Sequence, residues 1–371
     1  MVASSIAFID NIIREAMKMG CSDIHMDPYS SKVNIKYRID GIIYGIHQLP
    51  LEGYSRVVGR LKVMSGMDTT ERRIPQEGKF QFKFKEEIHD IRVSIIPTIK
   101  GEKVSIRILY NELKISELNQ IGFDKEVSKR IKKLLKASGG MILISGPTGS
   151  GKTTTLYAMI NEILNKNNNI ITLEDPVEYS VDGVNQINVN PKIGLTFSET
   201  LKSVIRQDPD VIMLGEIRDK ETAEISARAA ITGHLVMSTI HTEDAPSTIL
   251  RLIDMGIPKY MVGNAVRAVI AQRLIKKLCP HCKVEDENIK MDFIAYKSRG
   301  CTSCHHVGYL GRTLVYEIME IDDIHKEIIN NNFSTRLLKN HSIRTGMKSL
   351  KSRGLELFRE GITSLEELKA L

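Results

Sequence analysis

Alternation of apolar and polar residues dominates the first third of the chain. A period of two predicts strands with one buried and one solvated face, and apolar residues at helical spacing predict amphipathic helices. The predicted strands are 32–39, 79–84 and 91–95, and helices are expected at 1–20 and 54–66. Residues 1–110 are therefore expected to form a small α+β domain, followed by a linker over 111–122.

The pattern changes after residue 123, where short runs of uninterrupted apolar residues alternate with helical segments. The predicted strands are 141–145, 169–173, 210–214 and 235–239, and a helix is expected from Lys152 to about Asn165. Such strands, separated by helices, indicate a parallel sheet covered on both faces. An α/β core is expected over 123–278, then a cysteine-bearing module at 279–312 and a helical region at 313–371.

Composition supports an ordered protein and leaves the partner open. The 371 residues are 42% hydrophobic and 26% charged, which suits two or three globular domains. A net charge of +7 suits a phosphate ligand, an anionic membrane surface or nucleic acid, and equally a plain solvated surface. An aromatic content of 5% without Trp argues against a base-stacking single-strand binder.

Membrane and export signals are not apparent in the sequence. No apolar run approaches the ~20 residues of a membrane span, and the N-terminus has no basic segment before its apolar stretch, as a signal peptide would. A cytoplasmic location is expected, with the five cysteines reduced.

A glycine-rich run lies between the apolar strand 141–145 and the next helix. It reads Gly146, Pro147, Thr148, Gly149, Ser150, Gly151, Lys152, Thr153, and Thr154 follows it. In the pattern Gly-x4-Gly-Lys-Thr, glycines let backbone N–H groups turn around phosphates, the lysine reaches the β and γ oxygens, and the threonine hydroxyl ligates Mg²⁺. The strand–loop–helix context favours a nucleotide site over a chance match, and the expected ligand is ATP with Mg²⁺.

Two predicted strands end in acidic residues. Glu174 follows strand 169–173, and Glu216 follows strand 210–214. Parallel sheets bind ligands at the carboxyl ends of their strands, and hydrolysis of Mg²⁺–ATP needs carboxylates near the metal and the attacking water. Glu174 and Glu216 are therefore expected to be catalytic. The neighbouring acids Asp175 and Asp219 could equally be helix caps or surface charges.

Histidines and arginines near these elements have two open interpretations. His234 and His241 flank strand 235–239, where a histidine could sense a γ-phosphate or serve a structural role. Arg92 and Arg107 lie on predicted strands of the first domain, after the pair at 72–73. A guanidinium suits phosphate charge, but spacing alone favours salt bridges or a solvated face.

Four of the five cysteines form two pairs. Cys279 and Cys282 are separated by 18 residues from Cys301 and Cys304. This spacing is typical of a tetrahedral zinc site whose four thiolates close the coordination sphere, so the metal is expected to be structural. A disulfide pair, free thiols or participation of His281, His305 and His306 are the alternatives. Cys21 lies outside the pattern.

Together these motifs resemble the secretion ATPases of type II secretion, type IV pilus assembly and DNA-uptake (competence) systems. The resemblance extends over almost the whole chain. The occurrence of all the matching segments in the same order is more specific than any single motif. The matching segments are 22–28, 71–78, 101–107, 171–179, 206–219, 233–242, 271–274 and 308–312.

The resemblance implies a RecA-like core, a PAS-like N-terminal domain and a homohexamer with ATP between the two domains. It also implies a cytoplasmic protein that is peripheral to the inner membrane through a membrane platform protein, with no direct nucleic-acid binding. By position, Glu216 resembles the Walker B acid and Glu174 the water-activating base. Arg92 and Arg107 resemble phosphate-contacting arginines, Arg206 an assisting residue, and His241 the γ-phosphate-linked histidine.

Several alternatives stay open at this stage. A pilus retraction ATPase shares the core but lacks the tetracysteine module, and a nucleic-acid-translocating motor or a non-hydrolysing scaffold belongs to a different class. Long family members carry a further N-terminal domain that is not expected here, which leaves recruitment open. The stretch between the cysteine pairs is shorter than is usual in the family. The machine that this chain serves is not specified by these motifs.

Overall fold

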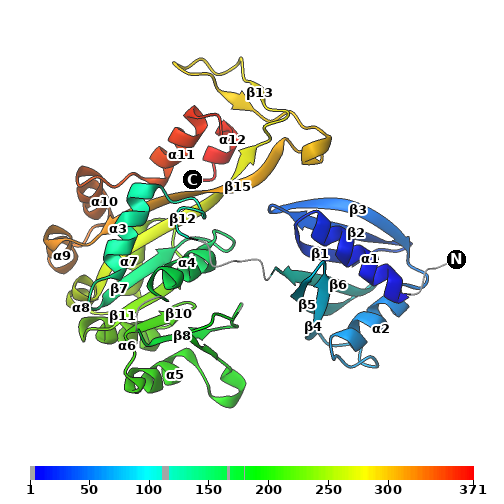
Figure 1. The fold of residues 1–371 in the computed structure, drawn as a ribbon, viewed down its shortest axis with the longest axis horizontal. Coiled ribbons are helices and arrows are strands. Elements are labelled where there is room, and N and C mark those ends of the chain that lie inside the picture. The colour runs from blue at the N-terminus through cyan, green and yellow to red at the C-terminus, as the bar shows by residue number, and fades with distance from the viewer. Residues whose placement is uncertain (1–4, 111–116, 165–167, 179) are drawn as a thin grey trace. The chain divides into compact units, whose positions relative to one another are not determined.

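The computed structural model describes residues 5–110, 117–164, 168–178 and 180–371, in two compact units, Met1–Lys114 and Ile115–Leu371 (Figure 1). The first part of the expected linker, residues 111–116, and the expected end of a helix near residue 165 lie outside the described residues.

The alternating pattern of the first unit builds an antiparallel sheet of six strands, in the order β3-β2-β1-β6-β5-β4. The strands are β1 (Cys21–Pro28), β2 (Lys32–Ile39), β3 (Ile42–Pro50), β4 (Gln76–Phe84), β5 (Glu87–Thr98) and β6 (Gly101–Leu109). The predicted strands correspond to β2, β4 and β5, whereas β1 and β3 were not predicted.

Two helices cover one face of this sheet, and the other face is polar. Helix α1 (Ser5–Lys18) and helix α2 (Tyr54–Met64) contribute Ile9, Ile13 and Leu61 to a core with the inward-facing strand residues. On the polar face, the register places Lys79, Arg92, Arg107, Asp23 and Arg38 side by side across β4, β5, β6, β1 and β2.

The second unit contains a seven-stranded sheet in the order β15-β12-β7-β11-β10-β8-β9. The strands are β7 (Gly140–Ser145), β8 (Ile170–Glu174), β9 (Asn185–Asn188), β10 (Val211–Leu214), β11 (Leu235–Ile240), β12 (Val266–Leu278) and β15 (Tyr309–Glu320). All neighbours are parallel except β12 and β15.

The sheet is thus mixed, where a parallel sheet was predicted. The antiparallel edge arises because β12 and β15 pair along almost their full lengths, from Ala268 opposite Glu320 to Leu278 opposite Tyr309. Residues 313–320, expected in a helical region, belong to β15, in which residues 314–319 are all buried.

Helices cover both faces of this sheet, as predicted. In β7, Met141 and Leu143 point into one core, and Ile142 and Ile144 point into the other. The helices are α3 (Lys125–Leu135), α4 (Lys152–Leu164), α5 (Phe197–Val204), α6 (Lys220–Ile231), α7 (Ala245–Asp254), α8 (Lys259–Ala265), α9 (Asp323–Asn330), α10 (Thr335–Arg344), α11 (Leu350–Arg359) and α12 (Leu365–Leu368). No helix in the described ranges is both long and apolar enough to cross a bilayer.

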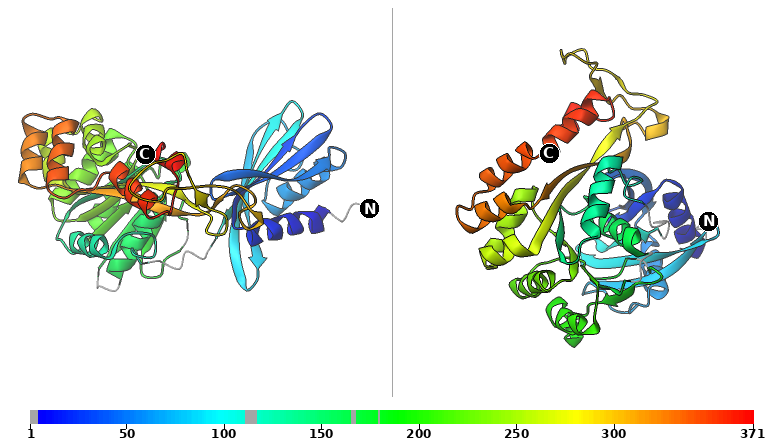
Figure 2. Two further views of the ribbon diagram at one scale, coloured as in Figure 1. Left: turned by 90° about the horizontal axis from the view of Figure 1, so that it is seen from above. Right: turned by 60° about the vertical axis from the view of Figure 1, so that its left-hand side comes forward.

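Strands β12 and β15 extend beyond the rest of the sheet toward the cysteine-bearing segment, which is coloured yellow to orange in Figure 2. That segment contains the short pair β13 (Val284–Glu285) and β14 (Tyr296–Lys297) and the 3₁₀ turn η3 (Thr302–Cys304). Two further 3₁₀ turns, η1 (Pro191–Ile193) and η2 (Ile205–Gln207), flank α5.

Candidate nucleotide site

The glycine-rich loop connects β7 to α4 at the carboxyl edge of the second sheet. The Lys152 ammonium donates to the carbonyl oxygens of Gly146 and Pro147, each at 2.9 Å. Gly146 has φ of 149°, and a Cβ there would lie 2.5 Å from the carbonyl oxygen of Gln272. Only glycine fits this position, because both the backbone angle and the close approach exclude a side chain.

A buried glutamine on β12 supports the loop from behind. The Gln272 side chain is fully buried, its Nε2 donates to the Ser150 carbonyl at 2.8 Å, and its Oε1 accepts from the Thr155 hydroxyl at 2.9 Å. From the sequence, Gln272 was only part of a family segment, without a predicted role. Its signal was a lone amide directly after the apolar run 268–271.

Glu216 and His241 lie at the same edge as Lys152, because β10 and β11 are adjacent parallel strands. The Glu216 carboxylate forms an ion pair with Arg218 and lies 3.7 Å from Nε2 of His241. Burial lowers the pKa of Lys152 to about 8, although the charge of Glu216 opposes this shift. Three of the expected catalytic side chains therefore share one electrostatic environment.

The two histidines of β11 lie at opposite ends of the strand. Nδ1 of His234 lies 3.0 Å from the Ala229 carbonyl, at the strand start and away from the glycine-rich loop. His241 follows the strand end, and burial, together with the charge of Lys152, lowers its pKa. The position of His234 thus favours the structural interpretation for that residue.

Glu174 ends β8 and is only 3% exposed. One of its oxygens accepts from the Tyr157 hydroxyl at 2.5 Å, and the other accepts from Thr172 at 2.6 Å and Gln186 at 3.2 Å. Both oxygens therefore accept hydrogen bonds from the protein. Because a carboxylate has about four acceptor positions, these three hydrogen bonds leave Glu174 one position for a water molecule.

The remaining expected ligands of the second unit are more exposed. Thr153 is exposed at the start of α4, and Thr154 is partly buried beside it. Arg206 lies on η2, where its exposed guanidinium is 3.4 Å from the Ser203 hydroxyl. The structure gives Arg206 no contact with the glycine-rich loop among the described residues.

Arg92 and Arg107 belong to the first unit and are direct neighbours on β5 and β6. Nε of Arg107 donates to the Asp23 carboxylate at 2.9 Å. Burial alone would raise the pKa of Asp23, but the hydrogen bonds from Arg107 and Ser22, together with the charge of Arg107, outweigh it and the pKa is lowered. With Lys79, these arginines line a cavity of about 550 Å³ on the polar face of the sheet.

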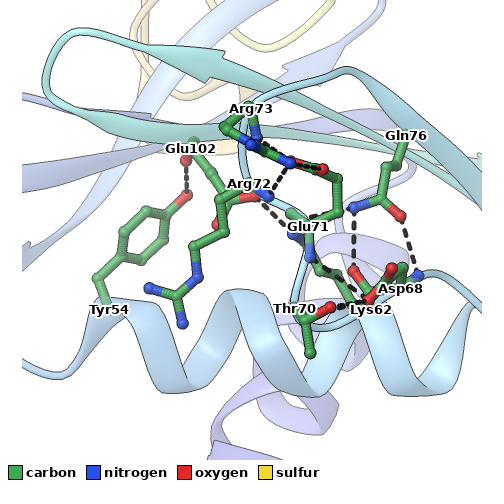
Figure 3. A network of polar contacts seen from close by, with 9 residues as sticks. All are labelled: Tyr54, Lys62, Asp68, Thr70, Glu71, Arg72, Arg73, Gln76 and Glu102. Atoms are coloured by element: carbon green, nitrogen blue, oxygen red, sulfur yellow. Dashed lines mark hydrogen bonds and ion pairs between the residues drawn. The ribbon is translucent and has the colours of Figure 1, made fainter.

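The connection that carries Arg72 and Arg73 is held by a polar network (Figure 3). Buried Lys62 forms an ion pair with Glu102 at 2.7 Å and donates to the Glu71 carbonyl. The Glu71 carboxylate accepts from the backbone N–H of both arginines and pairs with the Arg73 guanidinium. The backbone at this point is thus fixed, while both arginine side chains are exposed.

The four paired cysteines converge on one point. Cys279 lies 3.9 Å from Cys301, and Cys304 lies 3.7 Å from both Cys282 and Cys301, measured between sulfurs. In a tetrahedron with Zn–S bonds of ~2.3 Å, the sulfurs lie ~3.8 Å apart. The cysteines are free thiols, so the disulfide alternative is not realised.

Backbone groups favour an anionic sulfur at one cysteine, Cys304. The N–H groups of Cys301 and Gly308 each donate to the Cys304 sulfur at 3.2 Å. Burial raises the pKa of Cys304, but these hydrogen bonds, together with those from the Cys282 and Cys301 thiols, outweigh it and lower the pKa to about 6, whereas burial raises the pKa of Cys279 and Cys282. Among the described residues, the convergent group contains the four cysteines and none of the three nearby histidines.

Comparison with known proteins assigns the family. Residues 2–370 match the family model described as Type II/IV secretion system protein. The chain is 42% identical to the type IV pilus assembly ATPase PilB of Myxococcus xanthus, covering 99% of this chain and 67% of the relative. It is 40% identical to the type II secretion system ATPase E of Vibrio cholerae, covering 99% and 75%.

A solved structure of the pilus retraction motor PilT with bound ADP is also similar. It shares 27% identity at a TM-score of 0.68, covering 98% of this chain and 96% of that chain. The assembly and secretion ATPases are thus more similar in sequence than this retraction motor. On this evidence, the chain belongs to the type II/IV secretion system ATPase family.

Proposed function

We propose that this chain hydrolyses ATP within a homohexamer to power assembly of a type IV pilus, a type II secretion pseudopilus or a competence pilus. The observation that carries the proposal is the convergence of Lys152, Glu216 and His241 at one sheet edge beside the glycine-rich loop. The relatives that share most of this sequence are named for pilus assembly and type II secretion.

Within the site, each group has a distinct proposed role. The loop 146–154 binds the phosphates through the backbone N–H groups of every residue except Pro147 and through the Lys152 ammonium, and the Thr153 hydroxyl would hold Mg²⁺. The metal ion would neutralise charge on the phosphate oxygens. Glu216 would help to hold the metal ion, and His241, 3.7 Å from Glu216 at the end of the adjacent strand, would contact the γ-phosphate. Glu174 accepts the proton of the attacking water.

The polar face of the first unit is proposed to complete the site. Arg92 and Arg107, with Lys79 in register, supply cations in a cavity large enough for a phosphate chain. Arg206 would assist from the second unit. Because Arg107 is held by Asp23, releasing it to phosphate would exchange one ion pair for another.

The four cysteines are proposed to bind one structural Zn²⁺. Their sulfur separations and the N–H donors to Cys304 support this, and the ion would tie the segment between β12 and β15 together. Such a site contributes on the order of 10 kcal/mol to folding. The first unit, six strands with two helices on one face, is proposed to be PAS-like, and the second RecA-like.

The proposed partner is an inner-membrane platform protein, with the ATPase peripheral at the cytoplasmic face of that membrane. A retraction ATPase of the same family is the alternative that the PilT likeness leaves. A nucleic-acid motor is a second alternative. If DNA stimulated hydrolysis with a steep salt dependence, the nucleic-acid motor would be favoured over the assembly ATPase.

Hydrolysis assays on two variants test the site. Lys152→Ala is expected to abolish phosphate release, and Glu216→Gln is expected to bind ATP but hydrolyse it at least 100-fold more slowly, roughly the loss on removing one charge-stabilising group. Lys192→Ala, at an exposed position of the same unit, is the matched control. Near-normal turnover in either site variant would overturn the assignment.

A further inference from the structure

A second cluster of metal-binding side chains lies far from the cysteines in sequence, at the start of α9 and along α10. Asp322 caps α9, and its Oδ1 lies 2.8 Å from Nδ1 of His325. Its Oδ2 lies 2.8 Å from Nε2 of His341. The two imidazole rings meet edge to face, with centroids 4.4 Å apart. Two imidazoles thus converge on one carboxylate.

Burial separates this cluster from an ordinary surface ion pair. The side chains of His325 and His341 are 1% and 9% exposed, whereas that of Asp322 is 46% exposed. Within the described residues, one ligand atom from each of the three lies within 4.8 Å of the others. The nitrogens are therefore fixed inside the helical region, and the carboxylate faces the solvent.

The hydrogen-bond donors around His325 determine what its two nitrogens can do. The Ser342 hydroxyl donates its single proton to the Leu338 carbonyl at 2.8 Å. Ser342 must then accept from Nε2–H of His325, also at 2.8 Å. In a neutral imidazole this leaves only a lone pair at Nδ1. That lone pair accepts from the Asp322 backbone N–H at 3.4 Å and also lies 2.8 Å from a carboxylate oxygen of Asp322, a contact that a bound metal ion or a shared proton would satisfy.

We propose that Asp322, His325 and His341 bind a divalent transition-metal ion of the zinc class, at a site separate from the four cysteines. Two imidazoles and a carboxylate are the donor set that zinc accepts, and the fourth position would hold water. The Nε2–H to Ser342 contact is the kind of outer hydrogen bond that fixes the tautomer of a metal-ligating histidine.

Geometry and access both suit such an ion. With bonds of about 2.0–2.2 Å, ligand atoms around a tetrahedral metal lie roughly 3.4 Å apart. Side-chain movements of a few tenths of an ångström would therefore widen the present 2.8 Å contacts between Asp322 and the two histidines enough for the ion. A cavity of about 240 Å³, lined in part by Asp322, Ser342, Glu320 and Arg130, reaches the cluster from outside. Glu320 is paired with Arg130 and is not needed as a ligand.

The bound ion would join α9 to α10 in the region after the sheet. His325 belongs to α9, His341 belongs to α10, and Asp322 precedes α9. A proton shared between Asp322 and the histidines is the competing way to satisfy the same contacts, and it would hold the helices without any metal. A measurement of bound zinc distinguishes a metal ion from a shared proton.

Zinc content of the full chain tests the proposal with two conservative variants. Asp322→Asn keeps a residue that caps helices well, and His341→Gln keeps an amide that can reach Asp322. Wild type, both variants and a His47→Gln control are loaded with zinc chloride, freed of unbound metal by gel filtration and analysed for zinc. His47 is an exposed histidine of the first unit.

Wild type and the control are expected to retain about one zinc ion per chain more than either variant. This difference does not depend on what the cysteines hold, because they are intact in all four proteins. Added zinc should also raise the unfolding midpoint of wild type more than that of His341→Gln. Equal zinc content in all four proteins, or an equal rise of both midpoints, would overturn the proposal.

Cobalt gives an independent readout of the same site. Co²⁺ at four thiolates produces sulfur-to-metal charge-transfer bands, whereas Co²⁺ bound by nitrogen and oxygen shows only weaker visible bands. Wild type is expected to show additional visible absorption, without additional charge transfer, that His341→Gln lacks. Identical cobalt spectra for the two proteins would show that the cluster holds no metal.

Discussion

Lys152 places a positive charge in a largely buried position of the unliganded protein, and the variant Lys152→Met shows what this charge costs. The residue is 9% exposed, and within the described part of the chain its ammonium donates hydrogen bonds to two loop carbonyls, of Gly146 and Pro147. Burial lowers its pKa from 10.5 to about 8. We therefore expect Lys152→Met to abolish hydrolysis and yet to stabilise the protein in the absence of nucleotide.

The magnitude follows from the pKa. The fall from 10.5 to about 8 corresponds to about 3 kcal/mol at ~1.36 kcal/mol per pH unit. Methionine fills similar space without the charge, while losing the two carbonyl contacts returns about 1 kcal/mol for each contact. The net stabilisation at pH 7 is about 1 kcal/mol, or a rise of roughly 2 °C or more in the midpoint of thermal unfolding.

The sign with pH follows from the same shift. Because the pKa of Lys152 is lower in the folded state, the unfolded chain binds more protons between about pH 8 and pH 10.5. Stability of wild type relative to Lys152→Met should therefore rise across that window. Urea unfolding at pH 7 and pH 10, with Lys192→Met as an exposed control, measures both effects.

Two results would refute this reasoning. If Lys152→Met were less stable than wild type at pH 7, the lysine charge would be compensated in the unliganded protein. If the stability difference between wild type and variant were the same at pH 7 and pH 10, the pKa of Lys152 would not be lowered by burial. The control is expected to leave both quantities unchanged.

Three further predictions concern the supports of the site. Gln272→Leu leaves the buried Ser150 carbonyl without its donor, so it should lower the free energy of urea unfolding by about 1–3 kcal/mol and weaken ATP binding. Unchanged stability and ATP affinity would show that the loop keeps its conformation without Gln272. Lys62→Met leaves Glu102 unpaired and should lower the free energy of unfolding by about 3 kcal/mol. The double variant with Glu102→Gln should regain part of this loss. Cys301→Ser should lose bound zinc and unfold at lower temperature, and a variant that keeps its zinc would contradict the four-thiolate site.

The features that the sequence predicted are those determined by residues close together in the chain. The loop around Lys152 was predicted because glycine spacing and a strand–helix context are both local. The cysteine pairs were predicted because spacing alone limits what they can ligate. Among the strands with clear alternation, β2 was predicted at its observed bounds, and β4 and β5 were predicted over part of their lengths.

Features that depend on contacts between distant segments were not predicted. β15 pairs with β12 across the whole cysteine-bearing segment, and no local signal fixes that register. The role of Gln272 depends on its position behind a loop more than 100 residues earlier, as its hydrogen bond to Ser150 shows. The burial of Glu174 depends on Tyr157 and Gln186, which reach it from two other elements.

Strand β12 joins the back of the nucleotide loop to the cysteine segment without an intervening turn. Gln272 contacts Ser150, and Cys279 follows directly after the strand end at Leu278. Seven residues at about 3.3 Å each span roughly 23 Å. β12 is paired with β15 over this length, with one irregularity in the register between Lys276 and Leu278, so bending the two strands elsewhere would break the hydrogen bonds between them. A displacement of the loop would therefore move the cysteines as well, because the two paired strands tilt as one rigid body.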